Sequence, residues 1–527
     1  MTHFLRSDVV LEPLVLQWFA VPHNVSPMTR PRLHVNRHLS LMRSFINDPR
    51  PHEMMAANPA MQGGAFFQLP AAEVPRVQEL LRRTEQATGA LEDYAKALTA
   101  LEAELHATAQ GEALEGRYAS LPPQLRGAVE LVYDLHQRPK VRLREGVLYR
   151  TPLYRVTDQQ VRAFRATEDV RHFYSTPRLP APGDVWLDLP FRSDAIAALA
   201  ASRFAPVRPE ALAERLGLRA EQRVAFDALF TDQVPPPAKP YEGPGLRVRY
   251  FGHACTTFEY QGITVCTDPS VPYVAQPGRR GFHELPPKLD FVVFSHAHPD
   301  HFSIEWLLAL RSRIGTIVVP RNEGGSLLDP SLKLLLHQLG FERVQEVDDG
   351  DELRLGPDFT LTALPFQGEH CDLDIRTKTV ALLRAGEFRV MALGDTNLLD
   401  LDAYRAFEPE VSRPDLVVAG LESEGAPITW GYGPLFASEV PRKLAMARRS
   451  NSANAQRTWP LVEMLKPAQI HVYSMGLEPW FRHVMGIEVT LESPQVKNAL
   501  TLCDRARGAG IDSEIMSMGW ERTLTHP

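Results

Sequence analysis

The sequence predicts a two-part α/β protein, with a mixed α+β domain at residues 1–240 followed by a two-sheet α/β domain at residues 245–527. The chain has 527 residues, which is too long for one ordinary hydrophobic core. A proline-rich segment at residues 234–245 interrupts the sequence pattern. Beyond this segment, strand-like stretches alternate with helical ones, an order that suits two sheets covered by outer helices.

The composition is that of a globular protein without nucleic-acid or membrane partners. Hydrophobic residues make up 44% of the chain and charged residues 23%, with a net charge of −7, which gives no sign of nucleic-acid binding. No stretch approaches the roughly 18 apolar residues of a membrane span, and the N-terminus lacks the pattern of a signal peptide. The four cysteines form no CxxC pair, which favours a reducing cytoplasm over a disulfide scaffold. We therefore expect a cytoplasmic location.

The first domain contains one well-marked helix. Apolar residues recur there at spacings of three and four, which places them along one face of a helix. This stripe consists of Leu91, Tyr94, Leu98, Leu101 and Leu105. Charged residues occupy the other faces. Two interpretations are open, because the stripe can pack on its own domain or against a second subunit.

The segment at residues 234–245 marks the domain boundary. Its prolines remove backbone hydrogen-bond donors and stiffen the chain, which is typical of an extended linker. Alternation typical of a strand begins directly afterwards at Leu246, Val248 and Tyr250.

The chemistry is concentrated in residues 291–301. Four apolar residues predict a short buried strand, and His296, His298, Asp300 and His301 follow within six positions. A strand cannot direct four such side chains to one centre, because alternate residues point to opposite faces. A tight loop at the strand end can do so. His296 and His298 can converge on one ion, and Asp300 and His301 on a second ion beside it.

This stretch resembles the HxHxDH signature of the metallo-β-lactamase superfamily. Residues 250–255, the Asp268-Pro269 turn and the strand at residues 390–393 followed by Asp395 are also similar to that superfamily. The resemblance implies an αββα sandwich for the second domain. It further implies that Asp395 bridges two metals, and that Asp268 orients the metal-binding histidines rather than binding metal.

Two positions depart from the zinc hydrolases of the superfamily. Where a histidine is usual after the middle strand, Glu369 and His370 stand side by side, and either can be the ligand. Near the C-terminus, Ser474 occupies the place of the last histidine, and His471 is expected to point to the other face of its strand. If Glu369 binds, the metal ligands are His296, His298, Asp300, His301, Glu369 and Asp395. Three imidazoles and three carboxylates favour iron or manganese over zinc.

With these departures, the sequence resembles one family, the diiron β-hydroxylases of nonribosomal peptide pathways. The similarity covers most of the chain, including the HxHxDH loop, Glu369, Asp395, residues 475–480 and the long N-terminal domain. It implies an oxo-bridged pair of iron ions, dioxygen as co-substrate and an external electron donor of the ferredoxin or reductase type. It also implies a homodimer formed through the N-terminal domain, which we expect to help wall the active-site entrance.

The resemblance further implies the reaction. We expect hydroxylation at the β-carbon of an aminoacyl thioester on a peptidyl carrier domain, in nonribosomal peptide or antibiotic biosynthesis. Glu369 and Asp395 are the expected catalytic residues.

Two other functions remain open. A dizinc hydrolase of an ester, lactone or phosphodiester would use a metal-bound hydroxide as nucleophile, with His370 rather than Glu369 as ligand. A scaffold protein with a vestigial site is the third possibility, but the intact cluster at residues 296–301 argues against it. Glu422 and Glu424 follow another predicted strand, and either face the site or cap a turn. The sequence names neither the amino acid that is hydroxylated nor the residues that line its pocket.

Overall fold

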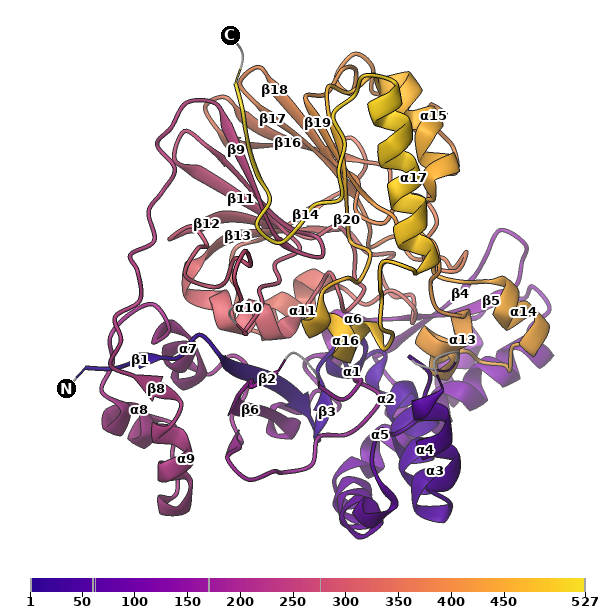
Figure 1. Cartoon of the computed structure of the whole chain (residues 1–527). Helices are drawn as coiled ribbons and strands as arrows, with labels where there is room; N and C mark the ends of the chain where they lie inside the picture. Colours follow the sequence, from indigo (N-terminus) through magenta and orange to yellow (C-terminus); the bar gives the residue numbers. More distant parts are fainter. Residues whose placement is uncertain (1, 59–60, 62, 169–170, 275, 526–527) are drawn as a thin grey trace.

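The C-terminal half is a sandwich of two β-sheets in the computed structural model, which describes residues 2–58, 61, 63–168, 171–274 and 276–525 (Figure 1). The first sheet has seven strands, in the order β14 (Val344–Val347), β13 (Ile314–Pro320), β12 (Leu289–Val293), β11 (Ile263–Thr267), β10 (Cys255–Tyr260), β9 (Leu246–Gly252) and β21 (Glu521–Leu524). The second sheet has six strands, in the order β15 (Glu352–Gly356), β16 (Phe359–Leu364), β17 (Val380–Ala385), β18 (Phe388–Ala392), β19 (Leu416–Gly420) and β20 (Ile470–Tyr473).

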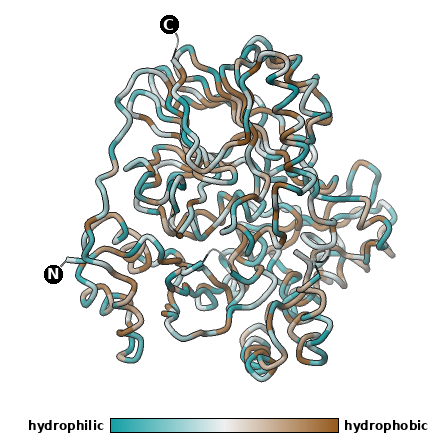
Figure 2. The backbone as a smooth tube through the Cα atoms, viewed as in Figure 1, coloured by the Kyte–Doolittle hydropathy of each residue, from teal (hydrophilic) through white to brown (hydrophobic). Residues whose placement is uncertain are grey.

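Helices cover the outer face of each sheet, as the αββα prediction requires. The apolar faces of β9, β10, β16, β17 and β18 form a core cluster between the sheets. Outside the first sheet lie α10 (Ile304–Leu310) and α11 (Leu332–Gln338). Outside the second lie α15 (Ala455–Leu465) and α17 (Pro494–Gly508). Figure 2 shows hydrophobic residues running along the sandwich strands.

The N-terminal half is a mixed α+β unit, as predicted. Its strands are β3 (Trp18–Phe19), β2 (Val9–Val15), β6 (Gln159–Arg165) and β7 (Val185–Leu187) in one antiparallel sheet, and the pairs β1 (Phe4–Leu5) with β8 (Phe230–Thr231) and β4 (Val129–Tyr133) with β5 (Pro139–Leu143). Its helices are α1 (Pro22–Val25), α2 (Arg30–Leu33), the π-helix η1 (His34–Leu39), α3 (Ser40–Asn47), α4 (Arg50–Ala57), α5 (Val74–Thr108), α6 (Glu145–Leu148), α7 (Asp194–Ala201), α8 (Pro209–Arg215) and α9 (Arg223–Asp227).

The apolar stripe of α5 packs inside its own chain. Leu91, Tyr94, Leu98, Leu101 and Leu105 are buried in a cluster with residues from α1–α2, β4 and α6. Each buried leucine contributes roughly 2 kcal/mol relative to exposure. The stripe therefore belongs to the core of the N-terminal half, and the second interpretation, contact with another subunit, is wrong for this face. The homodimer itself stays a prediction.

The two halves are joined by more than the extended segment before β9. One hydrophobic cluster runs from β2 and α7 of the N-terminal half into α10, α11 and β12 of the sandwich. Arg171 adds a buried ionic link, because its guanidinium donates to both Glu305 oxygens on α10, at 2.7 and 3.0 Å, and lies 3.4 Å from Glu12 on β2. Although burial raises the pKa of Glu12, Arg178, Arg171 and Arg162 outweigh it and hold the value near 2.

No helix in the described ranges combines the length and apolar character needed to cross a bilayer. The four cysteines are buried free thiols. The C-terminal half also contains four short α-helices. These are α12 (Asp402–Arg405), α13 (Ile428–Gly431), α14 (Arg442–Ala447) and α16 (Arg482–Met485).

A buried carboxyl group makes another link between the halves. Glu145 on α6 accepts hydrogen bonds from the Ser26 hydroxyl and from the backbone N–H of Ser331, both at 2.8 Å. Ser331 is the N-cap of α11 in the sandwich. Burial raises the pKa of Glu145 to about 7, against an ordinary value of 4.5.

This shift predicts a pH-dependent stability. Between pH 4.5 and 7 the folded state holds a proton on Glu145 that the unfolded state has lost, so the free energy of unfolding falls as pH rises through this window, by up to roughly 3 kcal/mol. Glu145→Gln removes this dependence, and its stability relative to the wild type should therefore rise from pH 4.5 to 7. Urea unfolding of both proteins across this range measures the difference. The surface change Glu85→Gln gives the baseline, and parallel profiles of wild type and Glu145→Gln would contradict the prediction.

Candidate metal centre

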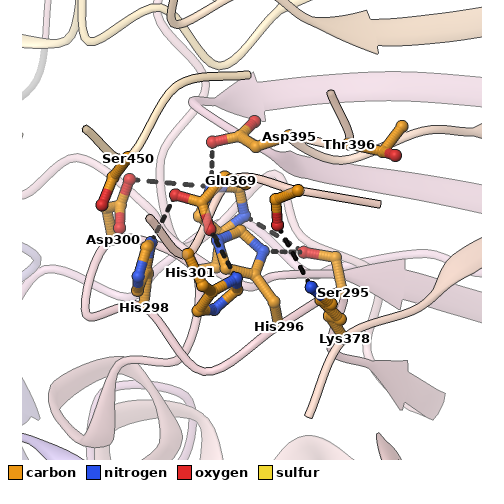
Figure 3. A network of polar contacts seen from close by, with 12 residues as sticks. Ser295, His296, His298, Asp300, His301, Glu369, Lys378, Asp395, Thr396 and Ser450 are labelled. Carbon is orange, nitrogen blue, oxygen red and sulfur yellow. Dashed lines mark hydrogen bonds and ion pairs between the residues drawn. The ribbon is translucent and has the colours of Figure 1, made fainter. Parts of the chain in front are cut away.

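The candidate ligands lie at one edge of the sandwich, where several strands of both sheets end. Asp300 and His301 follow β12, Glu369 follows β16, Asp395 follows β18 and Ser474 follows β20. Strands that run in the same direction bring their carboxyl ends to the same edge of a sheet. Residues far apart in the sequence therefore meet there, as Figure 3 shows.

The first group consists of His296, His298 and Glu369, whose ligand-type atoms lie within 4.8 Å of one another. Nδ1 of His298 is 2.8 Å from Oε1 of Glu369, and Nε2 of His296 is 3.9 Å from Oε2 (Figure 3). Glu369 has a left-handed backbone with φ of 69°, directly after Gly368 at 68°. Such strain persists at sites where the surroundings require one side-chain direction.

The second group centres on His301. Its Nε2 lies 3.1 Å from Asp395 Oδ2 and 3.6 Å from Asp300 Oδ2. His296 also reaches His301 and Asp395, with all ligand-type atoms within 4.8 Å. The six residues predicted from the sequence thus form two adjacent groups, with His296 and Asp395 between them.

The donor atoms of these groups fit metal ions. His296 Nε2, Glu369 Oε2 and Asp395 Oδ1 are buried and make no hydrogen bond to any described residue. Buried polar atoms without partners are costly, and a cation at the centre of each group would satisfy them. Three imidazoles with three carboxylates are a donor set suited to iron or manganese.

Carboxylates and imidazoles in the cluster shift one another's pKa values. Burial lowers the pKa of His301, but Asp395, Asp300 and Asp268 outweigh it and hold that pKa well above the usual value. Burial raises the pKa of Glu369, but His298 and His370 hold it well below the usual value. The Glu369 carboxylate is therefore held ionised beside the two imidazoles.

His370, the alternative to Glu369, lies beside the first group without joining it. Its Nδ1 is 2.8 Å from Glu369 Oε2, but outside hydrogen-bonding geometry, since neither atom has a hydrogen-bond partner among the described residues. None of the four groups of potential ligands in the described chain includes His370. The geometry favours Glu369.

Asp268 has the geometry expected of an orienting residue. It accepts hydrogen bonds from the backbone N–H of Ser295 at 2.8 Å and from its hydroxyl at 2.6 Å. Its Oδ2 also lies 2.9 Å from Nδ1 of His301. This contact fixes the imidazole so that Nε2 faces Asp395 and Asp300.

Strand alternation predicts the direction of His471 correctly, and Ser474 lies directly after the same strand, β20. His471 on β20 faces away from the site, and its Nδ1 accepts the backbone N–H of Glu514 at 3.1 Å. Ser474 Oγ lies 3.2 Å from His253 Nε2 and 3.4 Å from His301 Nε2. The Ser474 hydroxyl therefore lies beside two imidazoles of the site.

Sequence reasoning gave no role to His253, which the structure places against Asp300. Its Nε2 lies 3.0 Å from Asp300 Oδ2, and its backbone N–H donates to Glu478 Oε1 at 2.6 Å. Burial lowers the pKa of His253, but hydrogen bonds to Asp300 and Glu478 outweigh it and raise the pKa to about 10. The only sequence signal was the similarity of residues 250–255, which include His253, to the metallo-β-lactamase superfamily.

The sequence left open whether Glu422 faces the site or caps a turn, and in the structure it faces the site. It forms a further group with Asp300 and Asp395, within 4.8 Å. Burial, reinforced by these two carboxylates, raises the pKa of Glu422 well above its usual value.

A cavity of about 370 Å³ adjoins the cluster and is walled by both halves of the chain. From the sandwich, its lining includes His298, Asp300, Glu369, Glu422 and Glu424. From the N-terminal half, it includes Val21, His23, Leu33, Arg37, Phe173 and Tyr174. A substrate in this cavity would touch both halves while lying beside the cluster.

Comparison with known proteins gives matches along almost the whole chain. Residues 4–235 match the family model described as the diiron non-heme β-hydroxylase N-terminal domain, and residues 264–432 match the β-lactamase superfamily domain. Over 536 residues the chain is 32% identical to the 4-amino-L-phenylalanyl-(CmlP peptidyl-carrier-protein) 3-hydroxylase of Streptomyces venezuelae, covering 99% of this chain and 100% of that protein.

Two further comparisons extend this result. The crystal structure of CmlA, a diiron β-hydroxylase from Streptomyces venezuelae, matches with a TM-score of 0.92 at 31% identity and covers 99% of each chain. A UPF0173 protein of Pyrococcus abyssi is 26% identical over 237 residues, covering 42% of this chain and 97% of that protein.

Proposed function

The chain belongs to the diiron non-heme β-hydroxylase family, and on this basis we propose that it hydroxylates the β-carbon of an aminoacyl group held as a thioester on a peptidyl carrier domain. The observation that carries the proposal is the full-length similarity to a hydroxylase named for such a substrate. The cavity beside the histidine–carboxylate cluster supports it, because it has room for an aminoacyl group next to the ligands. We place the reaction in nonribosomal peptide or antibiotic biosynthesis.

We assign His296, His298 and Glu369 to one iron and Asp300 and His301 to the other, with Asp395 between them. When bound, the two irons supply dioxygen activation with electrons from an external donor of the ferredoxin or reductase type. The chain's own residues position this centre. Asp268 orients His301 at 2.9 Å, and His253 holds Asp300 at 3.0 Å.

The N-terminal half has a role in the same proposal. Residues 1–240 would form the dimerisation and substrate-access domain, and residues 245–527 the diiron catalytic domain. Support comes from the cavity wall, because Leu33, Phe173 and Tyr174 of that half line the cavity beside the ligands. Exclusion of water protects a reactive centre from side reactions.

The rival function, a dizinc hydrolase, is less well supported. It would need His370 in place of Glu369, and His370 lies in none of the groups of potential ligands among the described residues. The metal content and absorption spectrum of anaerobically purified protein separate the two. Two irons with near-ultraviolet absorption support the hydroxylase, and two zincs without iron support the hydrolase.

The first prediction of this proposal concerns the ligand set. Glu369→Ala should reduce iron to one ion or fewer per chain, because the carboxylate completes the first group with His296 and His298. His370→Ala is the matched control at the adjacent position and should keep two irons. Metal analysis after anaerobic reconstitution measures both. Loss of iron from His370→Ala with retention in Glu369→Ala would reverse the assignment.

A second prediction concerns the form of the substrate. An amino acid loaded on its carrier domain should gain one oxygen atom at the β-carbon, whereas the same free amino acid should not react. The reason is that the carrier and its arm contribute binding that the free amino acid lacks. Mass spectrometry of both reactions, run with the same reductant, decides the question. Equal turnover of free and tethered amino acid would refute the proposal.

A third prediction concerns assembly. We expect a homodimer formed through the N-terminal half, where Leu135 and Val224 are 99% and 83% exposed. A stable interface buries on the order of 1,000 Å² or more, so several N-terminal segments must take part. Light scattering of the full chain should give twice the mass of one chain. A mass of one chain at micromolar concentration would remove the dimerisation role.

A further inference from the structure

Arg37 is a buried cation that faces the cavity from an unusual element. It lies on the π-helix η1 (His34–Leu39), between α2 and α3. π-Helical turns are rare and are frequently found at functional sites. Arg37 is 8% exposed and lines the cavity beside the cluster. Its Nη2 donates to the backbone carbonyls of Trp430 at 2.5 Å and Thr429 at 3.4 Å.

The charge of Arg37 has no counterion. It forms no ion pair with any residue in the described ranges, and its other two guanidinium nitrogens make no hydrogen bond there. Burial therefore lowers the pKa of Arg37, although Tyr174 opposes part of the shift. Leaving a buried charge unpaired is strongly unfavourable, so the arrangement indicates an anion that the chain itself does not supply.

Other buried arginines of the N-terminal half have ion-pair or backbone partners for their guanidinium groups. Arg30 pairs with Asp158 at 2.6 Å, and Arg178 with Glu12 at 2.9 Å. Arg203 makes no ion pair with a described residue, but two of its nitrogens donate to the backbone carbonyls of residues 6, 7 and 9. Arg37 differs because a single nitrogen makes all of its hydrogen bonds, while the group lines an open cavity.

A second arginine lines the same cavity. Arg449 follows α14, and its Nε is buried without a hydrogen bond to any described residue. Glu422 and Glu424 also line the cavity, but within the described chain neither lies within ion-pair distance of Arg37 or Arg449. Glu422 instead groups with Asp300 and Asp395. The cavity thus combines an acidic cluster at the metal ligands with two unpaired guanidinium groups.

We propose that Arg37 and Arg449 form an oxyanion-binding subsite that recognises an anionic group of the carrier-tethered substrate. The planar guanidinium fork matches the two oxygens of a carboxylate or phosphate. A tethered aminoacyl group offers two such sources, the carboxylate of an acidic side chain and the phosphodiester of the carrier's prosthetic arm. This inference rests on the proposed function, and it names the chemistry by which the cavity selects its substrate.

The test measures binding to the iron-loaded full chain without reductant, so that no turnover occurs. The probes are carrier domains bearing aspartyl, asparaginyl or leucyl groups through a non-hydrolysable amide. Arg37→Gln should weaken binding of the recognised anion by roughly 30-fold or more, the loss typical of truncating one partner of a buried charge pair. Arg449→Gln should weaken it by a smaller factor, because Arg449 is half-buried. Arg43→Gln is the matched control, because Arg43 on α3 is an exposed arginine paired with Glu85 and does not line the cavity.

The pattern across the probes identifies the anion. Weakening confined to the aspartyl carrier assigns the subsite to a side-chain carboxylate. Equal weakening with all three carriers, absent for the same aminoacyl groups on pantetheine without phosphate, assigns it to the phosphodiester. Arg37→Lys, which keeps the charge, should recover part of the affinity in either case.

Unchanged affinity of both Gln variants for every probe would overturn the proposal. If Arg37→Gln fails to fold by circular dichroism, Arg449→Gln decides alone, because the Arg449 side chain has no hydrogen bond to lose within the described chain. Failure of the proposed function gives a different result. With reductant added, the wild type would then hydroxylate no carrier-bound amino acid in a panel of all the common amino acids, whether or not the variants alter binding.

Discussion

The structure depends on holding several carboxylates together away from water. Asp268, Asp300, Glu369 and Asp395 are all buried at one edge of the sandwich. Buried carboxylates repel one another and are stable only beside cations or hydrogen-bond donors. The strand-end loop with His296, the serine hydroxyls and the left-handed backbone at Glu369 can all be understood as meeting this requirement. Two metal ions would complete the compensation, since three donor atoms at the centre have no hydrogen-bond partner in the described chain.

The N-terminal half completes the site from outside the sandwich. Its residues wall the cavity, and its position is fixed by a continuous hydrophobic cluster, by Arg171 on Glu305 and by Glu145 on Ser331. These links are buried, so small shifts between the halves would cost several contacts at once. The sandwich alone therefore has the ligands, whereas the shape of the cavity is a property of both halves.

The parts of the site that the sequence predicts are those set by local geometry. His296, His298, Asp300 and His301 follow one strand, and strand alternation was enough to turn His471 away from the cluster. The choice between Glu369 and His370 was open because both consecutive residues carry a side chain that can bind metal. Which side chain points to the histidines depends on the backbone, which is left-handed at Glu369. The link from His253 to Asp300 joins residues 47 positions apart, and no local pattern contains it.

The same limit applies to the N-terminal half. The spacing of the α5 stripe predicted a buried helix face but not which surface covers it. The cavity lining from η1 and from Phe173 was also out of reach, because it depends on how two halves of different pattern pack together.

The shared core has a consequence for how the chain is made. The apolar faces of β2 and α7 are covered by α10, whose residues 304–310 lie far downstream. The first strand, β1, can pair only after its partner β8 (Phe230–Thr231) has been synthesised. A nascent chain leaving the ribosome therefore carries uncovered hydrophobic surface until the beginning of the sandwich has emerged, and such surface attracts aggregation and chaperones. Expression at low temperature or with added chaperones should favour the folded protein for this reason, and separate production of the first half would leave that surface permanently open.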